Sequence, residues 1–229
     1  MSICGETIDY GPCAFINKYN PKTVFSSIDR FGRYAFGNQH KIAYWNLTVF
    51  AGTMLSFINS DKERAIEMVQ NILNQFPIEY SKKWYEMMYN KLGIMHPIEE
   101  DKLLVKNLLA LMESYESDYT NTFASLTSNK PYENSLFLSN KFKKWKKKWL
   151  ERIENDENSY KLMKMNNPIC IPRNHLVESA LEKAVNGNKQ EFDKLLSLMS
   201  KTYNYDEKHH EFQTIPDSFD ETYQTFCGT

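Results

Sequence analysis

The sequence predicts a mainly α-helical protein with a small β element near its start. Three observations lead to this fold class. Between residues 41 and 201, apolar residues recur at spacings of three and four, the period of helices that bury one face. Residues 1–40 lack this period and are rich in Gly, Pro, Tyr and Phe. Near the start, Ile8 precedes Asp9-Tyr10-Gly11-Pro12, which is typical of a strand end followed by a turn.

Length and composition restrict the class of protein. The 229 residues suffice for one domain or one large lobe with its own core. The 28 Lys and Arg residues nearly balance 29 Asp and Glu residues, so no overall charge favours nucleic acid or an anionic membrane as a partner. No stretch reaches the ~18 apolar residues of a membrane span. The start has no signal-peptide pattern, and the four cysteines form no Cys-x-x-Cys pair. We therefore expect a cytoplasmic protein with reduced thiols.

The chain divides into three predicted regions. Residues 1–40 contain the Asp9 turn and a long irregular segment, and such long loops are usually functional. Residues 41–201 form a helical domain. Residues 202–229 are polar without a clear period, and we expect this tail to be ordered only if it docks on the rest.

Capping residues and prolines give the helix limits within residues 41–201. The first helix carries apolar residues from Ile42 to Ile58 and is expected to face the core. Ser60-Asp61-Lys62-Glu63 resembles a capping box that begins the second helix, and Pro77 is expected to end it. A third helix is predicted over 78–92, with a stop at Gly93, and a fourth from Glu99-Glu100 onward. The apolar residues of this fourth helix are Leu103, Leu104, Leu108, Leu111 and Met112. Later helices are predicted over 136–153, from an Asn174 cap to Gly187, and from there to about Lys201.

A run of lysines from Lys141 to Lys148 permits two interpretations. Basic runs with interleaved aromatic residues can bind nucleic acid, anionic lipid or a partner groove. However, the apolar residues Leu138, Phe142, Trp145, Trp149 and Ile153 fall on one helical stripe. The lysines would then occupy the opposite, solvated face, and the acidic residues from Glu151 to Glu157 would cancel their field. We favour the solvated face. The histidines, including His209-His210, show no metal-ligand spacing.

Several motifs together resemble one known family. Asp9-Tyr10-Gly11-Pro12 is followed by Phe15, Tyr19, Pro21, Ser27, Asp29, Gly32-Arg33-Tyr34, Asn38-Gln39 and Trp45-Asn46, and later by the segments Asn167–His175 and Thr225–Thr229. In order and spacing they resemble the selenoprotein O family of protein adenylyltransferases, once called pseudokinases. The resemblance covers the whole chain and is most specific over residues 9–46. One departure is His40, which stands where the family usually has Pro.

The resemblance implies a fold and an activity. This chain would be the large-lobe, C-terminal portion of a protein-kinase-like α+β fold. The family transfers AMP from ATP to Ser, Thr or Tyr hydroxyls of proteins, with Mg²⁺ as the cofactor. Asp9 would be the metal ligand and thereby an ATP-binding residue, as the Asp of the kinase Asp-Phe-Gly motif is. A carboxylate suits this role because Mg²⁺ prefers oxygen ligands.

The resemblance also implies that the other catalytic groups lie outside these residues. In the family, the glycine-rich loop, a Lys–Glu ion pair and a catalytic Asp-Asn pair belong to the first half. That Asn would fall immediately before Met1, so we expect Met1 to be an internal methionine of a longer family protein. We assign no catalytic residue to this chain and expect it to be inactive by itself.

Two further sites are considered. Arg33 can pair with a phosphate, or with Asp29 in an ion pair that shapes the loop. Cys227 lies near the end where some family members carry selenocysteine, which implies a possible redox role. The candidate partner in the loop is Cys13. Phe25 stands where some family members have a cysteine, which argues against a regulatory disulfide. The alternative for Cys227 is an ordinary free thiol.

Other function classes stay open at this point. The chain can be a non-catalytic helical module that binds a protein partner, or a degenerate remnant of the enzyme. Nucleic-acid binding through the lysine run is a third possibility, which predicts a steep salt dependence. A thermal shift caused by Mg·ATP separates a nucleotide site from a pure binding module.

Overall fold

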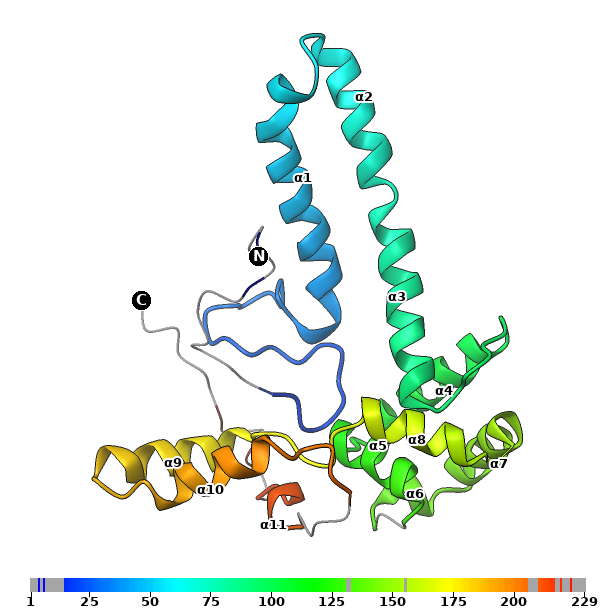
Figure 1. Cartoon of the computed structure of the whole chain (residues 1–229), viewed down its shortest axis with the longest axis vertical. Helices are drawn as coiled ribbons and strands as arrows, with labels where there is room; N and C mark the ends of the chain where they lie inside the picture. Colours follow the sequence, from blue (N-terminus) through cyan, green and yellow to red (C-terminus); the bar gives the residue numbers. More distant parts are fainter. Residues whose placement is uncertain are drawn as a thin grey trace. The chain divides into compact units, whose positions relative to one another are not determined.

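The computed structural model describes residues 4, 6, 15–130, 133–154, 156–205, 210–216, 219 and 223. Asp9, Cys13, Cys227 and the β element expected around Asp9 lie outside these residues. The described part is mainly α-helical, as the sequence predicted (Figure 1), and it includes an isolated antiparallel β-bridge between Lys18 and Asp118. The chain divides into two compact units. Asn20–Tyr85 form the body of the first, and Ala14–Tyr19 with Glu86–Tyr223 form the second.

The first unit is built on a helical hairpin. A 3-10 turn, η1 (Phe36–Asn38), leads into α1 (Gln39–Ile58), and α2 (Lys62–Leu73) runs back beside it (Figure 1). The N-cap of α2 is Asp61, whose carboxylate accepts the backbone N–H groups of Glu63 and Arg64 at 3.0 and 3.3 Å. The expected capping box based on Ser60 is therefore wrong by one residue.

Pro77 begins a helix instead of ending one. α2 stops at Leu73, and α3 (Phe76–Lys91) carries Pro77 in its first turn. A proline fits there because the first N–H groups of a helix have no intrahelical acceptor. The predicted stop at Gly93 is confirmed. Gly93 has φ +71°, and a Cβ at this position would lie 2.8 Å from the backbone oxygen of Ser159.

The prediction that α1 faces the core is wrong. None of its residues is buried: Trp45 and Val49 are each 50% exposed and Phe57 is 81% exposed. The apolar residues of α1 are spread around the helix, so no single face collects them. The spacing of three and four therefore predicted the helical conformation correctly, but the burial that we inferred from it was wrong.

The second unit contains eight further helices among the described residues. They are α4 (Asp101–Ser114), α5 (Tyr119–Ser128), α6 (Ser135–Leu138), α7 (Asn140–Ile153), α8 (Glu157–Asn166), α9 (Asn174–Val185), α10 (Gln190–Met199) and α11 (His210–Gln213). Neither α5 nor α8 was predicted. α5 consists largely of Thr, Ser and Asn, which are weak helix formers. It is helical because Asp118 caps it and most of its residues are buried.

The aromatic stripe of α7 forms the centre of this unit. Phe142, Trp145, Trp149 and Ile153 are all buried, as predicted. The indole N–H of Trp145 donates to the carbonyl of Leu104 at 2.9 Å, and that of Trp149 donates to the carbonyl of Leu92 at 2.8 Å. Two expectations fail here. Ser139 caps α7 in an extended conformation and so breaks the predicted helix over 136–153, and Leu138 is 70% exposed.

A smaller core joins the tail to the rest of the unit. Cys170, Leu198 and Phe212 are buried together, so part of the polar tail does dock. Tyr205 adds a hydrogen bond of 2.9 Å from its hydroxyl to the carbonyl of Asn167. Among the described residues, no helix has the length and apolar character needed to cross a bilayer.

Candidate functional site

Asp9, the expected metal ligand, and Cys227, the possible redox residue, fall outside the described residues. The described segment that follows the Asp9 turn is residues 15–19. It belongs to the second unit, where the Asn167–His175 motif and the start of α5 hold it. This attachment is the part of the candidate site that the structure describes.

Asn174 binds the backbone at the start of this segment. Its side-chain oxygen accepts the N–H of Phe15 at 3.3 Å, and its amide donates to the carbonyl of Phe15 at 3.4 Å. The predicted role of Asn174 as a helix cap is wrong. Asn174 is the first residue of α9, and Arg173 occupies the cap position with no side-chain cap bond. The amide of Asn174 is thereby available to fix a segment 159 residues away in sequence.

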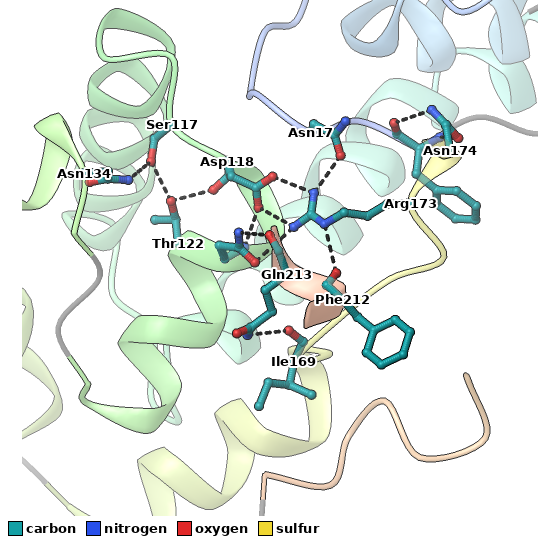
Figure 2. A network of polar contacts seen from close by, with 12 residues as sticks. Asn17, Ser117, Asp118, Thr122, Asn134, Ile169, Arg173, Asn174, Phe212 and Gln213 are labelled. Atoms are coloured by element: carbon teal, nitrogen blue, oxygen red, sulfur yellow. Dashed lines mark hydrogen bonds and ion pairs between the residues drawn. The ribbon is translucent and has the colours of Figure 1, made fainter. Parts of the chain in front are cut away.

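Arg173 is the centre of a buried polar network, shown in Figure 2. Its side chain is fully buried. One terminal nitrogen donates to the side-chain oxygen of Asn17 at 2.6 Å and to Asp118 at 2.8 Å, and the other donates to Asp118 at 3.2 Å and to Asn121 at 3.0 Å. The Nε–H donates to the carbonyl of Phe212 at 3.2 Å. We call these residues, Asn17, Asp118, Asn121, Arg173 and Phe212, the Arg173 network.

All five N–H donors of the guanidinium are therefore used. This matters because burying an ion pair costs several kcal/mol per charge unless hydrogen bonds satisfy both partners. Arg173 and Asp118 neutralise each other in a bidentate pair, the geometry that suits Arg and that Lys cannot reproduce.

Asp118 links the network to both the segment and α5. Its carboxylate accepts the N–H of Asn121 at 2.6 Å and so caps α5. On either side of Asp118, the N–H of Tyr119 donates to the carbonyl of Asn17 at 2.8 Å, and the N–H of Tyr19 donates to the carbonyl of Ser117 at 2.9 Å. Residues 17–19 therefore pair with residues 117–119 as a short antiparallel bridge.

Further polar contacts extend from α5. The amide of Asn121 donates to the carbonyl of Gln213 at 2.9 Å, and the amide of Gln213 donates to the carbonyl of Ile169 at 2.9 Å. On the other side, Ser117 shares a hydrogen bond with Thr122 and accepts one from Asn134, both at 2.9 Å (Figure 2). The docked tail and the Asn167–His175 motif thus stabilise the same network.

Burial changes the acid–base behaviour of several nearby groups. It raises the pKa of Tyr119 strongly, and neighbouring Tyr19 adds to that rise. It lowers the pKa of Lys91 to about 8; the ammonium lies 4.6 Å from the ring centre of Phe123. It also raises the pKa of the Cys170 thiol to about 11, against a smaller opposite effect of Arg173. Cys170 is therefore a protonated, unreactive thiol at neutral pH.

The loop candidates Asp29 and Arg33 do not form the expected ion pair with each other. The carboxylate of Asp29 accepts the backbone N–H groups of Arg33 and Tyr34 at 2.8 and 2.7 Å, which shapes the turn. The guanidinium of Arg33 lies over the ring of Trp45, 4.6 Å from its centre. Asp29 therefore shapes the loop through backbone contacts, and Arg33 stacks on an aromatic ring.

The roles of Arg173 and Asp118 in this network were not predicted from the sequence. One available signal was the Asn167–His175 segment, which stood out by resemblance but was read as a helix cap. The other was Asp118 before Tyr119-Thr120, the pattern of an N-cap. Nothing local indicated Asn17 as their partner, because 156 residues separate it from Arg173.

The network itself has the chemistry of an attachment site. Its charges are paired and buried, so it presents no free base, nucleophile or cation to a substrate. Among the described residues, no group of three His, Cys, Asp or Glu side chains is placed to hold a metal ion. The described residues therefore position the segment that follows the Asp9 turn.

Comparison with known proteins gives one consistent result. Residues 1–200 match the family model described as protein adenylyltransferase SelO. Proteins named protein nucleotidyltransferase YdiU match the whole chain at 45% identity in Bacillus cereus (strain AH820) and at 47% in Clostridium botulinum (strain Loch Maree / Type A3). The chain covers 48% of each of these relatives, so it spans about half of their length. The chain belongs to the SelO family of protein adenylyltransferases.

Proposed function

We propose that this chain is the C-terminal part of an enzyme that transfers AMP from ATP to Ser, Thr or Tyr hydroxyls of proteins. The observation that carries the proposal is the family match over residues 1–200, which includes the Asp9-Tyr10-Gly11 motif. Asp9 is the proposed metal and ATP ligand, and the proposed compartment is the cytoplasm. Cys227 is a possible redox residue of the same enzyme.

The Arg173 network supports this proposal. Residue 15, where the held segment begins, lies four positions after Gly11. By fixing residues 15–19 to α5 and α9, the network would anchor the chain a few residues after the Asp9-Tyr10-Gly11 motif. A carboxylate that binds a nucleotide-bound metal benefits from such fixation, because catalysis of this type depends on positioning.

The magnesium that the family implies would not be held by this chain alone. Mg²⁺ demands an octahedral set of oxygen ligands and usually keeps phosphate oxygens and waters among them. Asp9 is one such ligand, and the described residues offer no metal-binding cluster. Asp9 and the described residues would therefore supply only part of the ligand set of such a site. When bound, the ion would offset the charge on the ATP phosphates.

The test uses a chimera in which this chain replaces the matched region of the Clostridium botulinum relative. We expect the chimera to transfer tagged AMP to protein in the presence of Mg²⁺, and Asp9→Asn to abolish the transfer. The matched control is Asp193→Asn, which changes an exposed carboxylate in the first turn of α10. The 229-residue chain by itself should give no transfer.

Two results would contradict the proposal. One is a folded chimera that gives no labelling, with the fold checked by circular dichroism and a cooperative melt. The other is equal labelling by the Asp9→Asn and Asp193→Asn variants. Labelling by the isolated chain that Asp9→Asn removes would contradict only the proposed inactivity of the isolated chain.

A second candidate function is a non-catalytic module that binds a protein partner. The exposed apolar residues of α1, such as Phe57 and Trp45, favour it. Mg·ATP discriminates between the two candidates. Mg·ATP should raise the melting temperature of the folded chimera, and Asp9→Asn should abolish that rise, whereas equal behaviour of the two chimeras favours the binding module.

A further inference from the structure

A groove lies between α4 and α7 in the second unit. The two helices pack against each other, and the groove between them has a volume of about 630 Å³. Leu104, Ala110, Leu111 and the edge of Trp145 are among its apolar lining residues. Trp145 is 4% exposed and its indole is bonded to Leu104, so the floor is fixed in place.

One side of the groove is lined by three lysines. Lys141, Lys144 and Lys148 follow each other at spacings of three and four along α7, which places them on one face of the helix. All three are exposed, and among the described residues they have no hydrogen-bond or ion-pair partner. We expected all the lysines of the run to lie on one solvated face, but they fall into two groups. Half of the run borders an apolar groove.

The charge of the lining is positive. Its acidic residues are Glu100 and Asp101, and Asp101 is already paired with Arg152 at 2.8 Å. This leaves three unpaired lysines against the single carboxylate of Glu100. The other lysines of the run differ, since Lys147 faces Glu151 at 3.9 Å and Lys146 contacts Asn129 at 3.5 Å.

The opposite side exposes an unexpected leucine. Leu103 belongs to the apolar run that predicted α4, but its side chain is 61% exposed and lines the groove. Leu104 and Leu111 of the same run are only half-buried. The buried apolar residues of α4 are on a different stripe of the helix, which does not line the groove: Val105, Leu108, Leu109 and Met112. A run of leucines beside unpaired lysines is the pattern of a binding groove for an amphipathic segment.

We propose that the α4–α7 groove binds a short, acidic, amphipathic helix of a partner protein. Its apolar residues, spaced at three and four, would cover Leu103, Leu104 and Leu111, and Asp or Glu on one flank would face Lys141, Lys144 and Lys148. α4 has 14 residues, which corresponds to a groove about 20 Å long and a partner helix of about three to four turns. This proposal does not depend on the proposed nucleotidyl transfer.

The geometry favours a helix over the other anionic partners. Single-stranded nucleic acid binds through exposed aromatic faces, but Trp145 is buried and the exposed floor is aliphatic. A membrane surface favours a projecting apolar face flanked by basic residues, whereas here the apolar residues line a concave groove.

The test measures binding of acidic amphipathic peptides to the 229-residue chain. A set of fluorescent 14-residue peptides, matching the length of α4, carries Leu at helical spacing and Glu on one flank in every register. A control set has Lys in place of Glu. Fluorescence anisotropy is recorded at low and high salt, and an oligonucleotide and phosphatidylserine vesicles are titrated in parallel.

Two matched variants locate the binding. We expect Lys141→Gln/Lys144→Gln/Lys148→Gln to weaken peptide binding about ten-fold, since three partly exposed ion pairs are lost. Lys143→Gln/Lys146→Gln/Lys147→Gln removes the same charge outside the groove and should change binding by less than about two-fold. Leu103→Ser should weaken binding without changing its salt dependence.

Several results would overturn the proposal. They are the absence of saturable binding by every acidic peptide, equal losses in the two triple variants, and equal binding of the Lys-flanked peptides. Tighter binding of the oligonucleotide or the vesicles than of any peptide would assign the lysines to nucleic acid or lipid instead.

Discussion

Helices α1 and α7 show that apolar content and burial are different properties. α1 is rich in apolar residues, yet none of its 20 residues is buried. α7 carries six lysines in 14 residues, yet it buries two tryptophans, a phenylalanine and an isoleucine. The difference lies in the arrangement. The apolar residues of α7 form one stripe that a single neighbour surface can cover, whereas those of α1 surround the helix.

The two units also differ in the contacts that stabilise them. In the second unit, buried aromatic residues and the Arg173 network make contacts between segments far apart in sequence. In the first unit, the hairpin of α1 and α2 relies on contacts between neighbours in sequence, and large apolar side chains stay exposed. Substitutions in the second unit should therefore cost far more than those in α1.

The largest effect is expected for Trp149→Ala. This side chain is fully buried, so its loss removes a large apolar contact and leaves a cavity. It also removes the hydrogen bond to the buried carbonyl of Leu92. We expect the free energy of unfolding to fall by about 4–5 kcal/mol, measured by urea denaturation. A loss below about 1 kcal/mol would show that α7 does not carry the core.

The next effect is expected for Arg173→Ala, at about 3–4 kcal/mol, because Asp118 is left as an unpaired buried charge. Arg173→Lys should restore only a small part of this stability, since an ammonium has three donors and cannot serve the five acceptor atoms of the guanidinium. The matched control is Arg64→Ala, an exposed residue 4.0 Å from Asp61, with an expected change within about 0.5 kcal/mol.

Hydrogen exchange distinguishes a role in attaching residues 15–19 from general stabilisation. In Arg173→Lys, the amides of Tyr19 and Tyr119, which bond across the bridge, should lose protection before the amides of α7 do. Uniform loss of protection across the second unit would contradict this role.

Lys91→Met should stabilise the protein at neutral pH by about 2 kcal/mol. Burial lowers the pKa of Lys91 from 10.5 to about 8, so below pH 8 the fold carries a charged, desolvated ammonium. The unfolded state binds more protons between pH 8 and 10.5, so the stability of the wild type rises through this window. The advantage of Lys91→Met should therefore shrink between pH 8 and 10. Thermal melts across this range test it, and a constant difference between the two proteins would contradict the burial effect.

The smallest effect is expected for Phe57→Ala in α1. Because this side chain is 81% exposed, little apolar contact is lost, and the free energy of unfolding should change by less than about 0.5 kcal/mol. The same urea measurement that reports Trp149→Ala gives the direct contrast. A loss above about 2 kcal/mol would show that α1 is covered by a surface that the apolar pattern does not reveal.

Local sequence signals were reliable wherever the determinant was itself local. The helical stripe of α7 and the stop at Gly93 were predicted correctly, because side-chain spacing and the φ of glycine act within a few residues. The resemblance of residues 9–46 correctly indicated the family. The metal role of Asp9 and the redox role of Cys227 remain predictions.

Predictions from local sequence were wrong where the structure depends on a partner far away in the sequence. α5 was missed because its weak helix formers are held by the Asp118 cap and by burial on both sides. Asn174 was read as a cap because that role needs only its own helix, whereas its actual partner is Phe15. Leu103 was counted in the apolar run that predicted α4, but the buried stripe of this helix runs through Leu108 and Met112.

The sequence by itself determined the family, the helical class and the position of the most regular helices, since each depends on short-range pattern. Tertiary structure alone decided which apolar faces are buried and which residues meet in the Arg173 network. The physical reason is that burial requires a complementary surface, and a buried ion pair requires every donor to find an acceptor. The partners in the network lie up to 156 residues apart along the chain, beyond the reach of any local pattern.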